Sequence, residues 1–143
     1  MYAALRALPV PEEPVARLWH AATLLREHRG DGDIVALVAE GIGGTEAHVL
    51  HALSEGIPAE KFGRVHHLPV VRLAAVVEGM RARGLIDAAG WLSDAGREKK
   101  QRIESLTDDL AAPTYDSLRP SDLDQLIADL EPITTALDAA GSR

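Results

Sequence analysis

The densest group of side chains that could bind a ligand lies near the start of the chain. Its members are polar or aromatic: Trp19, His20, Arg26, His28 and Arg29. Helical spacing places Trp19 and Arg26 on one face, and Arg26 and Arg29 on one face. An arginine pair beside an indole suits an anionic small molecule. A helix C-terminus that ends at Gly30 explains the same residues, because Arg and His complement the helix dipole there.

A second group of basic side chains lies in the middle of the chain and is the candidate contact with DNA. Residues 69–83 have helical spacing and form the candidate recognition helix, from which Arg72 can reach a guanine edge or a phosphate. The rest of that helix face is small and apolar, so packing against protein is an alternative that stays open. The predicted DNA-binding residues are Arg64, His66, His67, Arg72 and Arg83.

Other chemistry has weaker support in the sequence. His48 and His51 lie one helical turn apart and could bind a metal with His66 and His67 if the segments converged. An H-E-x-x-H pattern is absent, so we predict no metal site. The motifs G-x-S-x-G, G-x-x-x-x-G-K-[ST] and G-x-G-x-x-G are also absent. We therefore expect a protein that is not an enzyme and has no cofactor.

Charge and composition narrow the class of partner. The chain of 143 residues has a formal net charge of −7 and no cysteine, which excludes disulfides and thiolate chemistry. Residues 56–97, with six basic and four acidic side chains, are the one basic region, so any surface that reads DNA has a weak field. No apolar run approaches the roughly 20 residues that span a bilayer, and no secretion signal is evident. We expect a cytoplasmic protein with no membrane partner.

Hydrophobic periodicity and helix-breaking residues predict mostly helices. Aromatic residues make up only 3 % of the chain, so the core must consist of Ala, Leu, Val and Ile. A tail of residues 1–12 precedes the first helix, and a glycine-rich break is predicted at 30–33. Two very short strands joined by a tight turn are predicted within 85–93. The predicted helices are 15–29, 33–40, 46–54, 58–64, 69–83, 94–111 and 121–139.

This order of elements predicts a mainly α, winged helix-turn-helix fold with a short two-stranded wing. We expect a single domain over 13–143, with the winged-helix core at 45–93. The flanking helices, 13–40 and 94–140, carry more apolar surface than a small three-helix core can cover. They are therefore predicted to be dimerisation helices that pair two copies of the chain.

Two short motifs resemble those of MarR-type regulators. Gly84-Leu85-Ile86 resembles the end of their recognition helix, and Leu92-Ser93-Asp94-Ala95-Gly96-Arg97 resembles the step into their long dimer helix. The resemblance covers residues 45–112, with Ser93 in place of the usual threonine. It implies a dimeric winged-helix protein that binds DNA. The predicted wing tip, residues 87–90, lacks the arginine that such wings usually carry.

A longer stretch is similar to a more specific group. Residues 18–32, LWHAATLLREHRGDG, resemble an actinobacterial family of unassigned function whose second half is helix-turn-helix-like. This resemblance extends over roughly residues 8–140. The additional N-terminal half of those proteins has no counterpart in this chain.

Together these observations predict a homodimeric, MarR-like transcriptional regulator that binds double-stranded DNA and responds to a small-molecule effector. The alternative is a winged-helix-derived module that binds a ligand or a protein and does not bind DNA. The net charge of −7 and the small, apolar side chains on the outer face of the candidate recognition helix favour that alternative.

Overall fold

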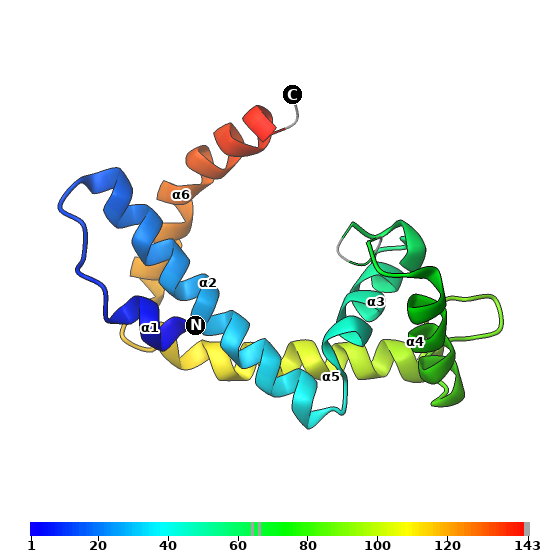
Figure 1. Ribbon diagram of the computed structural model, residues 1–143. Helices are drawn as coiled ribbons and strands as arrows, with labels where there is room; N and C mark the ends of the chain where they lie inside the picture. The colour runs from blue at the N-terminus through cyan, green and yellow to red at the C-terminus, as the bar shows by residue number, and fades with distance from the viewer. Residues whose placement is uncertain (64, 66, 142–143) are drawn as a thin grey trace. The chain divides into compact units, whose positions relative to one another are not determined.

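The computed structural model describes residues 1–63, 65 and 67–141. It contains two compact units: unit 1 spans Met1–Ala111, and unit 2 begins at Ala112. All regular elements in the described part are helical (Figure 1). Unit 1 holds α1 Tyr2–Arg6, α2 Pro14–Ala39, α3 Gly44–Ser54, η1 Ala59–Lys61, α4 Val70–Ala82 and α5 Asp94–Ala111, and unit 2 holds η2 Ala112–Tyr115 and α6 Pro120–Gly141.

Helix α2 runs without interruption through residues 30–33, so the predicted break there is wrong. Glu13 caps the helix, because its carboxylate accepts a hydrogen bond from Ala16 N at 2.6 Å. Gly32 lies against α5: a β-carbon at this position would be 3.3 Å from Leu110 Cβ. Each helical glycine costs about 1 kcal/mol relative to alanine. Packing against α5 offsets that cost. Such a tertiary contact cannot be inferred from the local sequence.

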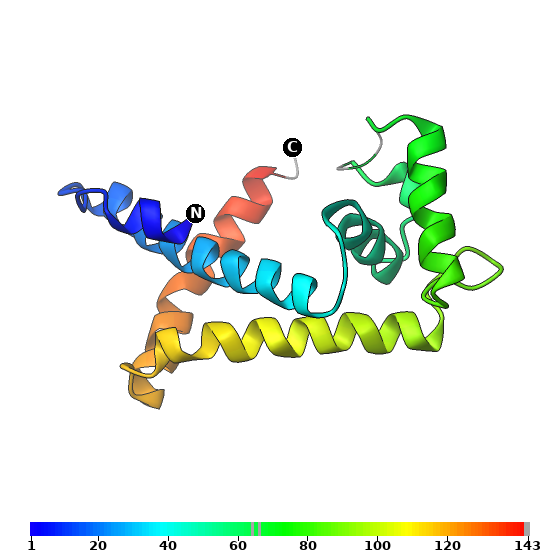
Figure 2. The same cartoon turned by 60° about the horizontal axis from the view of Figure 1, so that its bottom comes forward.

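Helix α5 lies along α2, and the predicted helix over 94–111 is confirmed (Figure 2). Ile103 and Thr107, one turn apart on α5, are both buried. The Thr107 hydroxyl donates a hydrogen bond to the Ile103 carbonyl at 2.8 Å and to Asp33 Oδ1 at 3.4 Å. The buried hydroxyl is therefore satisfied, as burial of a polar group requires.

The C-terminus of α2 is held to α5 by a carboxylate shared between two cations. Glu40 Oε2 lies 2.9 Å from Lys99 Nζ and 3.3 Å from Arg102 Nε. The hydrogen bond from Lys99, followed by that from Arg102, lowers the pKa of Glu40 below its ordinary value of 4.5. This carboxylate therefore stabilises the folded state above that value.

We expect Glu40 to make unit 1 sensitive to acid. A carboxyl group with a lowered pKa contributes stability that is lost as the pH falls from its unfolded pKa through its folded pKa. Urea unfolding between pH 6 and pH 3 measures this, and the difference in free energy between wild type and Glu40→Gln should shrink below about pH 4.5. Glu98→Gln, which removes an exposed carboxylate of α5 that pairs with no described residue, should show no such convergence. A pH-independent effect of Glu40→Gln would contradict the role of this ion pair.

Helices α3 and α4 form a helix-turn-helix pair joined by a segment that contains η1. Glu46 stabilises the start of α3, because its carboxylate accepts a hydrogen bond from Gly43 N at 2.9 Å. The prediction of helices at 46–54 and 69–83 is confirmed to within two residues at each boundary. The two helices share one apolar core, whose buried members include Val49, Leu50, Leu53, Leu73, Met80 and Leu85.

The predicted two-stranded wing is wrong, because the described residues contain no strand. Residues 85–93 form a tight turn with one isolated antiparallel bridge, between Ile86 and Leu92. Asp87 N donates to Trp91 O at 2.8 Å, and Gly90 has a φ of 92°. Asp94 already begins α5, so the segment is too short to pair further residues. The described residues thus form an all-helical helix-turn-helix fold without a wing.

The motif at 92–97 has a structural explanation in every polar position. Ser93 Oγ accepts a hydrogen bond from Gly96 N at 3.0 Å, which caps α5, and donates to Gly84 O at 2.5 Å. Arg97 donates to the Leu92 carbonyl and pairs with Asp94. The motif therefore holds the end of α4 against the start of α5.

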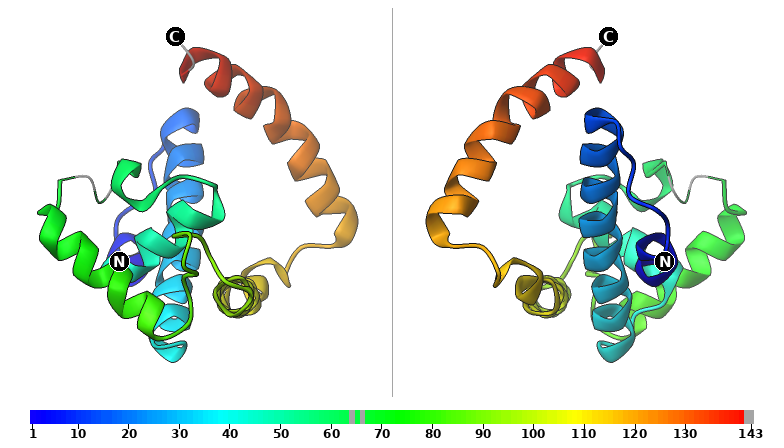
Figure 3. Two further views of the ribbon diagram at one scale, coloured as in Figure 1. Left: turned by 90° about the vertical axis from the view of Figure 1, so that its right-hand side faces the viewer. Right: turned by 90° about the vertical axis from the view of Figure 1, so that its left-hand side faces the viewer.

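Unit 2 consists of η2 and α6, and α6 continues through Pro132 (Figure 3). Arg119 and Asp122 form an ion pair of 2.8 Å at its start, which raises the pKa of Arg119 and lowers that of Asp122. No residue of α6 is buried, although Leu126, Ile133 and Leu137 recur along one face. Neither α6 nor any other described helix is long and apolar enough to cross a membrane.

Candidate functional site

The outward face of α4 is largely apolar. Leu73 and Met80 turn into the core, whereas Val70 and Val71 at the start of the helix are 83 % and 82 % exposed. Arg72 is also exposed, and its side chain makes no ion pair or hydrogen bond with any described residue. This guanidinium is therefore available to an external anion such as a phosphate.

Arg83, the last residue of the predicted DNA-binding set, lies just after α4 and already has internal partners. Its guanidinium donates hydrogen bonds to Gly41 O at 2.9 Å and to Glu46 Oε1 at 2.6 Å. It thus connects the end of α4 to the start of α3. We infer that its first role is to hold the two helices together.

The remaining members of that set lie in the connection before α4. His67 is exposed in a turn two residues before Pro69. Arg64 and His66 lie outside the described residues. Their predicted contact with DNA therefore stays a prediction from sequence.

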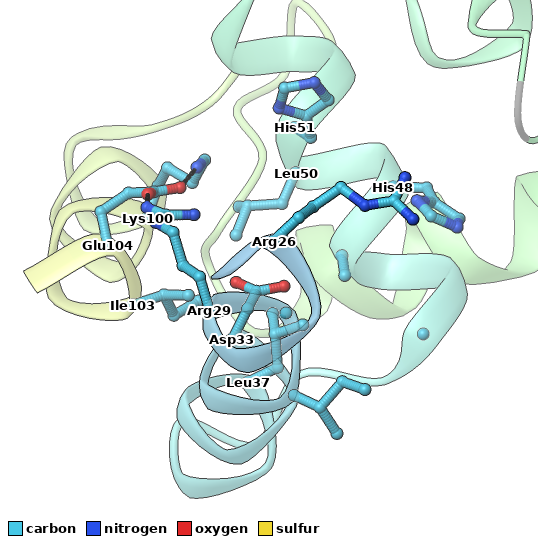
Figure 4. Close-up of a pocket in the computed structure, with 14 residues that line it drawn as sticks. Arg26, Arg29, Asp33, Leu37, His48, Leu50, His51, Lys100, Ile103 and Glu104 are labelled. Atoms are coloured by element: carbon cyan, nitrogen blue, oxygen red, sulfur yellow. Dashed lines mark hydrogen bonds and ion pairs between the residues drawn. The ribbon is translucent and has the colours of Figure 1, made fainter. Parts of the chain in front are cut away.

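A cleft of about 600 Å³ opens between α2, α3 and α5 of unit 1 (Figure 4). Its floor is apolar: Leu50 of α3 and Ile103 of α5 are each only 2 % exposed, and Leu37 of α2 packs against them. This volume lies in the range typical of small-molecule sites in proteins. The polar side chains around the floor are Arg26, Arg29, Asp33, His48, His51, Lys100 and Glu104.

The cations of the cleft are held by ion pairs. Arg29 lies 3.0 Å from Asp108 Oδ1 and 3.1 Å from Glu104 Oε2, and the hydrogen bond to Asp108 is the main cause that raises its pKa. Lys100 also pairs with Glu104, and this hydrogen bond lowers the pKa of that carboxyl group. Arg26 pairs only with its neighbour Glu27, at 2.6 Å, among the described residues. Each of the three cations of the cleft therefore has at least one carboxylate partner.

The structure divides the predicted ligand-binding residues into two groups. Arg26 and Arg29 line the cleft. Trp19 and His20 do not, and the indole of Trp19 is 73 % exposed elsewhere on α2. His28 packs instead against Tyr2, with ring centroids 4.9 Å apart.

Five polar side chains of the cleft are absent from the predicted set, among them Asp33 of α2. Two are His48 and His51, which the sequence suggests only as weak metal ligands. They lie near the ring of Phe62, at 6.3 Å and 5.5 Å between centroids. The described residues contain no cluster of His, Asp or Glu suited to a metal ion. The other two, Lys100 and Glu104, lie one helical turn apart on α5, a spacing that could have indicated them.

Comparison with known families supports the helix-turn-helix interpretation. A family model described as a helix-turn-helix family matches residues 1–142. The match thus includes α3 and α4 and also the other helices of both units. Curated proteins and solved structures gave no match. Because the family model covers nearly the whole length, the chain belongs to this helix-turn-helix family.

Proposed function

We propose that the protein is a dimeric, MarR-like transcriptional regulator that presents α4 to double-stranded DNA. The observation that carries the proposal is Arg72, an exposed cation on the second helix of the α3–α4 pair that pairs with no described residue. In helix-turn-helix proteins the second helix lies in the major groove. Membership of a helix-turn-helix family supports the same assignment.

The proposed dimer rests on apolar faces that neither unit covers. Only Ala36 is buried among the 26 residues of α2, and no residue of α6 is buried. Val15 and Trp19, in the N-terminal half of α2, are more than 70 % exposed. Exposed apolar stripes on long helices are typical of homodimer interfaces. A twofold axis would then set the spacing of the two α4 helices on DNA.

A salt-titrated binding assay with duplex DNA from upstream of the gene tests the proposal. Arg72→Ala should weaken binding about tenfold if Arg72 contacts a base, or lower the salt slope by about one if it contacts a phosphate. Arg81→Ala is the matched control, because Arg81 lies on the opposite side of α4 and pairs with Glu78 at 2.5 Å. Affinity that stays non-specific and does not respond to Arg72→Ala would contradict DNA recognition by α4.

A second candidate function is that of a module that binds a protein or a ligand and does not bind DNA. The specific observation in its favour is the exposure of Val70 and Val71, where a DNA-reading helix usually carries polar side chains. Replacing Val71 by lysine separates the two functions. The added charge should strengthen binding to DNA if α4 faces phosphates, and it should disrupt an apolar protein contact.

A further inference from the structure

The cleft between α2, α3 and α5 combines an apolar floor with a cationic rim. We propose that it binds an organic anion with an apolar body, in a site that does not include Trp19, His20 or His28. Leu50 and Ile103 provide an apolar floor, and Arg26 and Arg29 provide the charge. Ligand sites of this size combine apolar walls with a few placed polar groups.

Of the three cations of the rim, Arg26 is the most accessible to an anion, although the chain as a whole is acidic. Arg26, Arg29 and Lys100 line the cleft together with two carboxylates, Asp33 and Glu104. Two carboxylates outside the lining, Glu27 and Asp108, pair with Arg26 and Arg29. Arg29 and Lys100 share Glu104, whereas Arg26 is 75 % exposed and pairs only with Glu27 among the described residues. Figure 4 shows Arg26 extending from α2 toward His48 on α3. An anion between these two side chains would exchange water for hydrogen bonds to a guanidinium.

The position of the cleft gives the ligand a regulatory role, and this part rests on the proposed function. Helix α3 contributes Ala47, His48 and Leu50 to the cleft, and it also carries α4 through the shared core. The opposite walls belong to α2 and α5. A bound ligand therefore contacts both the helix-turn-helix pair and the helices that support it. If the ligand binds one arrangement of α3 relative to α2 and α5 more tightly than another, it shifts the equilibrium toward that arrangement.

Two fluorescent probes of matched skeleton test the binding step without DNA. Anilinonaphthalene sulfonate carries an anionic group on an apolar body, and N-phenylnaphthylamine has the same aromatic body without the charge. We expect the sulfonate to bind the wild-type protein at least about tenfold more tightly than the amine. The double variant Arg26→Gln with Arg29→Gln should lose at least about tenfold in affinity for the sulfonate alone. Arg17→Gln, on the same helix outside the cleft, is the control and should change it by less than about twofold.

A blocking variant locates the probe. Gly30 lies within α2 and lines the cleft, and a β-carbon there would have no atom within 4 Å. Gly30→Leu should fill the cleft, abolish probe binding and keep the fold, because leucine favours a helix over glycine. Gly79→Leu is the matched control: Gly79 is also helical and open, but it lies on α4 away from the cleft.

Each outcome decides the proposal. Loss of sulfonate binding in Gly30→Leu and in the arginine double variant, with binding retained in both controls, supports it. Equal binding in wild type and Gly30→Leu means that the probe sits elsewhere and overturns it. Loss in Gly30→Leu with no effect of the arginine double variant, or equal affinity for the two probes, overturns the anionic part. Because no DNA is present, these results are independent of whether α4 binds DNA.

Discussion

Gly96→Ala should lower the free energy of unfolding of unit 1 by about 3 kcal/mol or more. A β-carbon on Gly96 would come closer than 3.0 Å to the carbonyl oxygen of Leu85, and 3.3 Å from Leu92 Cδ2. The obstacle is backbone, which cannot rotate away as a side chain can. The turn after α4 would have to move from α5, and the bond between Ser93 and Gly84 would be strained.

Urea unfolding monitored by far-UV circular dichroism measures this effect, with Gly79→Ala as its control. Gly79 is helical and has open space at the position of its β-carbon. Alanine should therefore stabilise α4 there by up to about 1 kcal/mol. Glycine to alanine is thus expected to lower the free energy of unfolding at position 96 and to raise it at position 79. A Gly96→Ala protein as stable as wild type would show that the α4–α5 turn is not packed as described.

Lysine on the apolar stripe of α6 should raise the dissociation constant of the proposed dimer at least about 100-fold. The double variant Ile133→Lys with Leu137→Lys places two charges one helical turn apart. Both side chains are exposed in the single chain, at 44 % and 63 %, and lysine is a good helix former. Helix α6 itself should therefore persist, and only burial against a second copy should fail.

Sedimentation equilibrium distinguishes the two states by mass, since one chain is 15.3 kDa. The control is Ala128→Lys with Thr135→Lys, which places the same two charges on the opposite side of α6. This control should leave the mass at twice that of one chain. A wild-type protein that sediments as a single chain, or a stripe variant that still pairs, would exclude α6 from the interface.

Helix boundaries were largely predictable because their signals are local. Ser93 caps α5, and Gly84, with a φ of 75°, follows the end of α4, where few other residues fit. The helix over 94–111 and the helix-turn-helix pair are confirmed for this reason. The prediction of a wing also rested on a local pattern, and it was wrong. Apolar residues at 85–86 and 91–92 fit a strand pattern, but the chain between α4 and α5 allows only one bridging pair.

Of the seven polar side chains that line the cleft, only two belong to the ligand-binding set predicted from the sequence. Arg26 and Arg29 were identified because they lie in one dense polar run. His48, His51, Lys100 and Glu104 belong to α3 and α5, far away in sequence. Each of these residues could be assigned to a face of its own helix from the sequence. Nothing in the sequence indicates that these faces of α3 and α5 meet that of α2.

By itself, the sequence determined the ends of α3, α4, α5 and α6 to within two residues and which residues of each are apolar, since caps, glycines and periodicity act within one or two turns. Tertiary structure decided the rest. Packing of Gly32 against Leu110 keeps α2 continuous across its glycines. The same contact between α2 and α5, together with α3, brings the cationic rim over the apolar floor. Such contacts join residues distant in the chain, and their energy depends on how the helices pack rather than on any local preference.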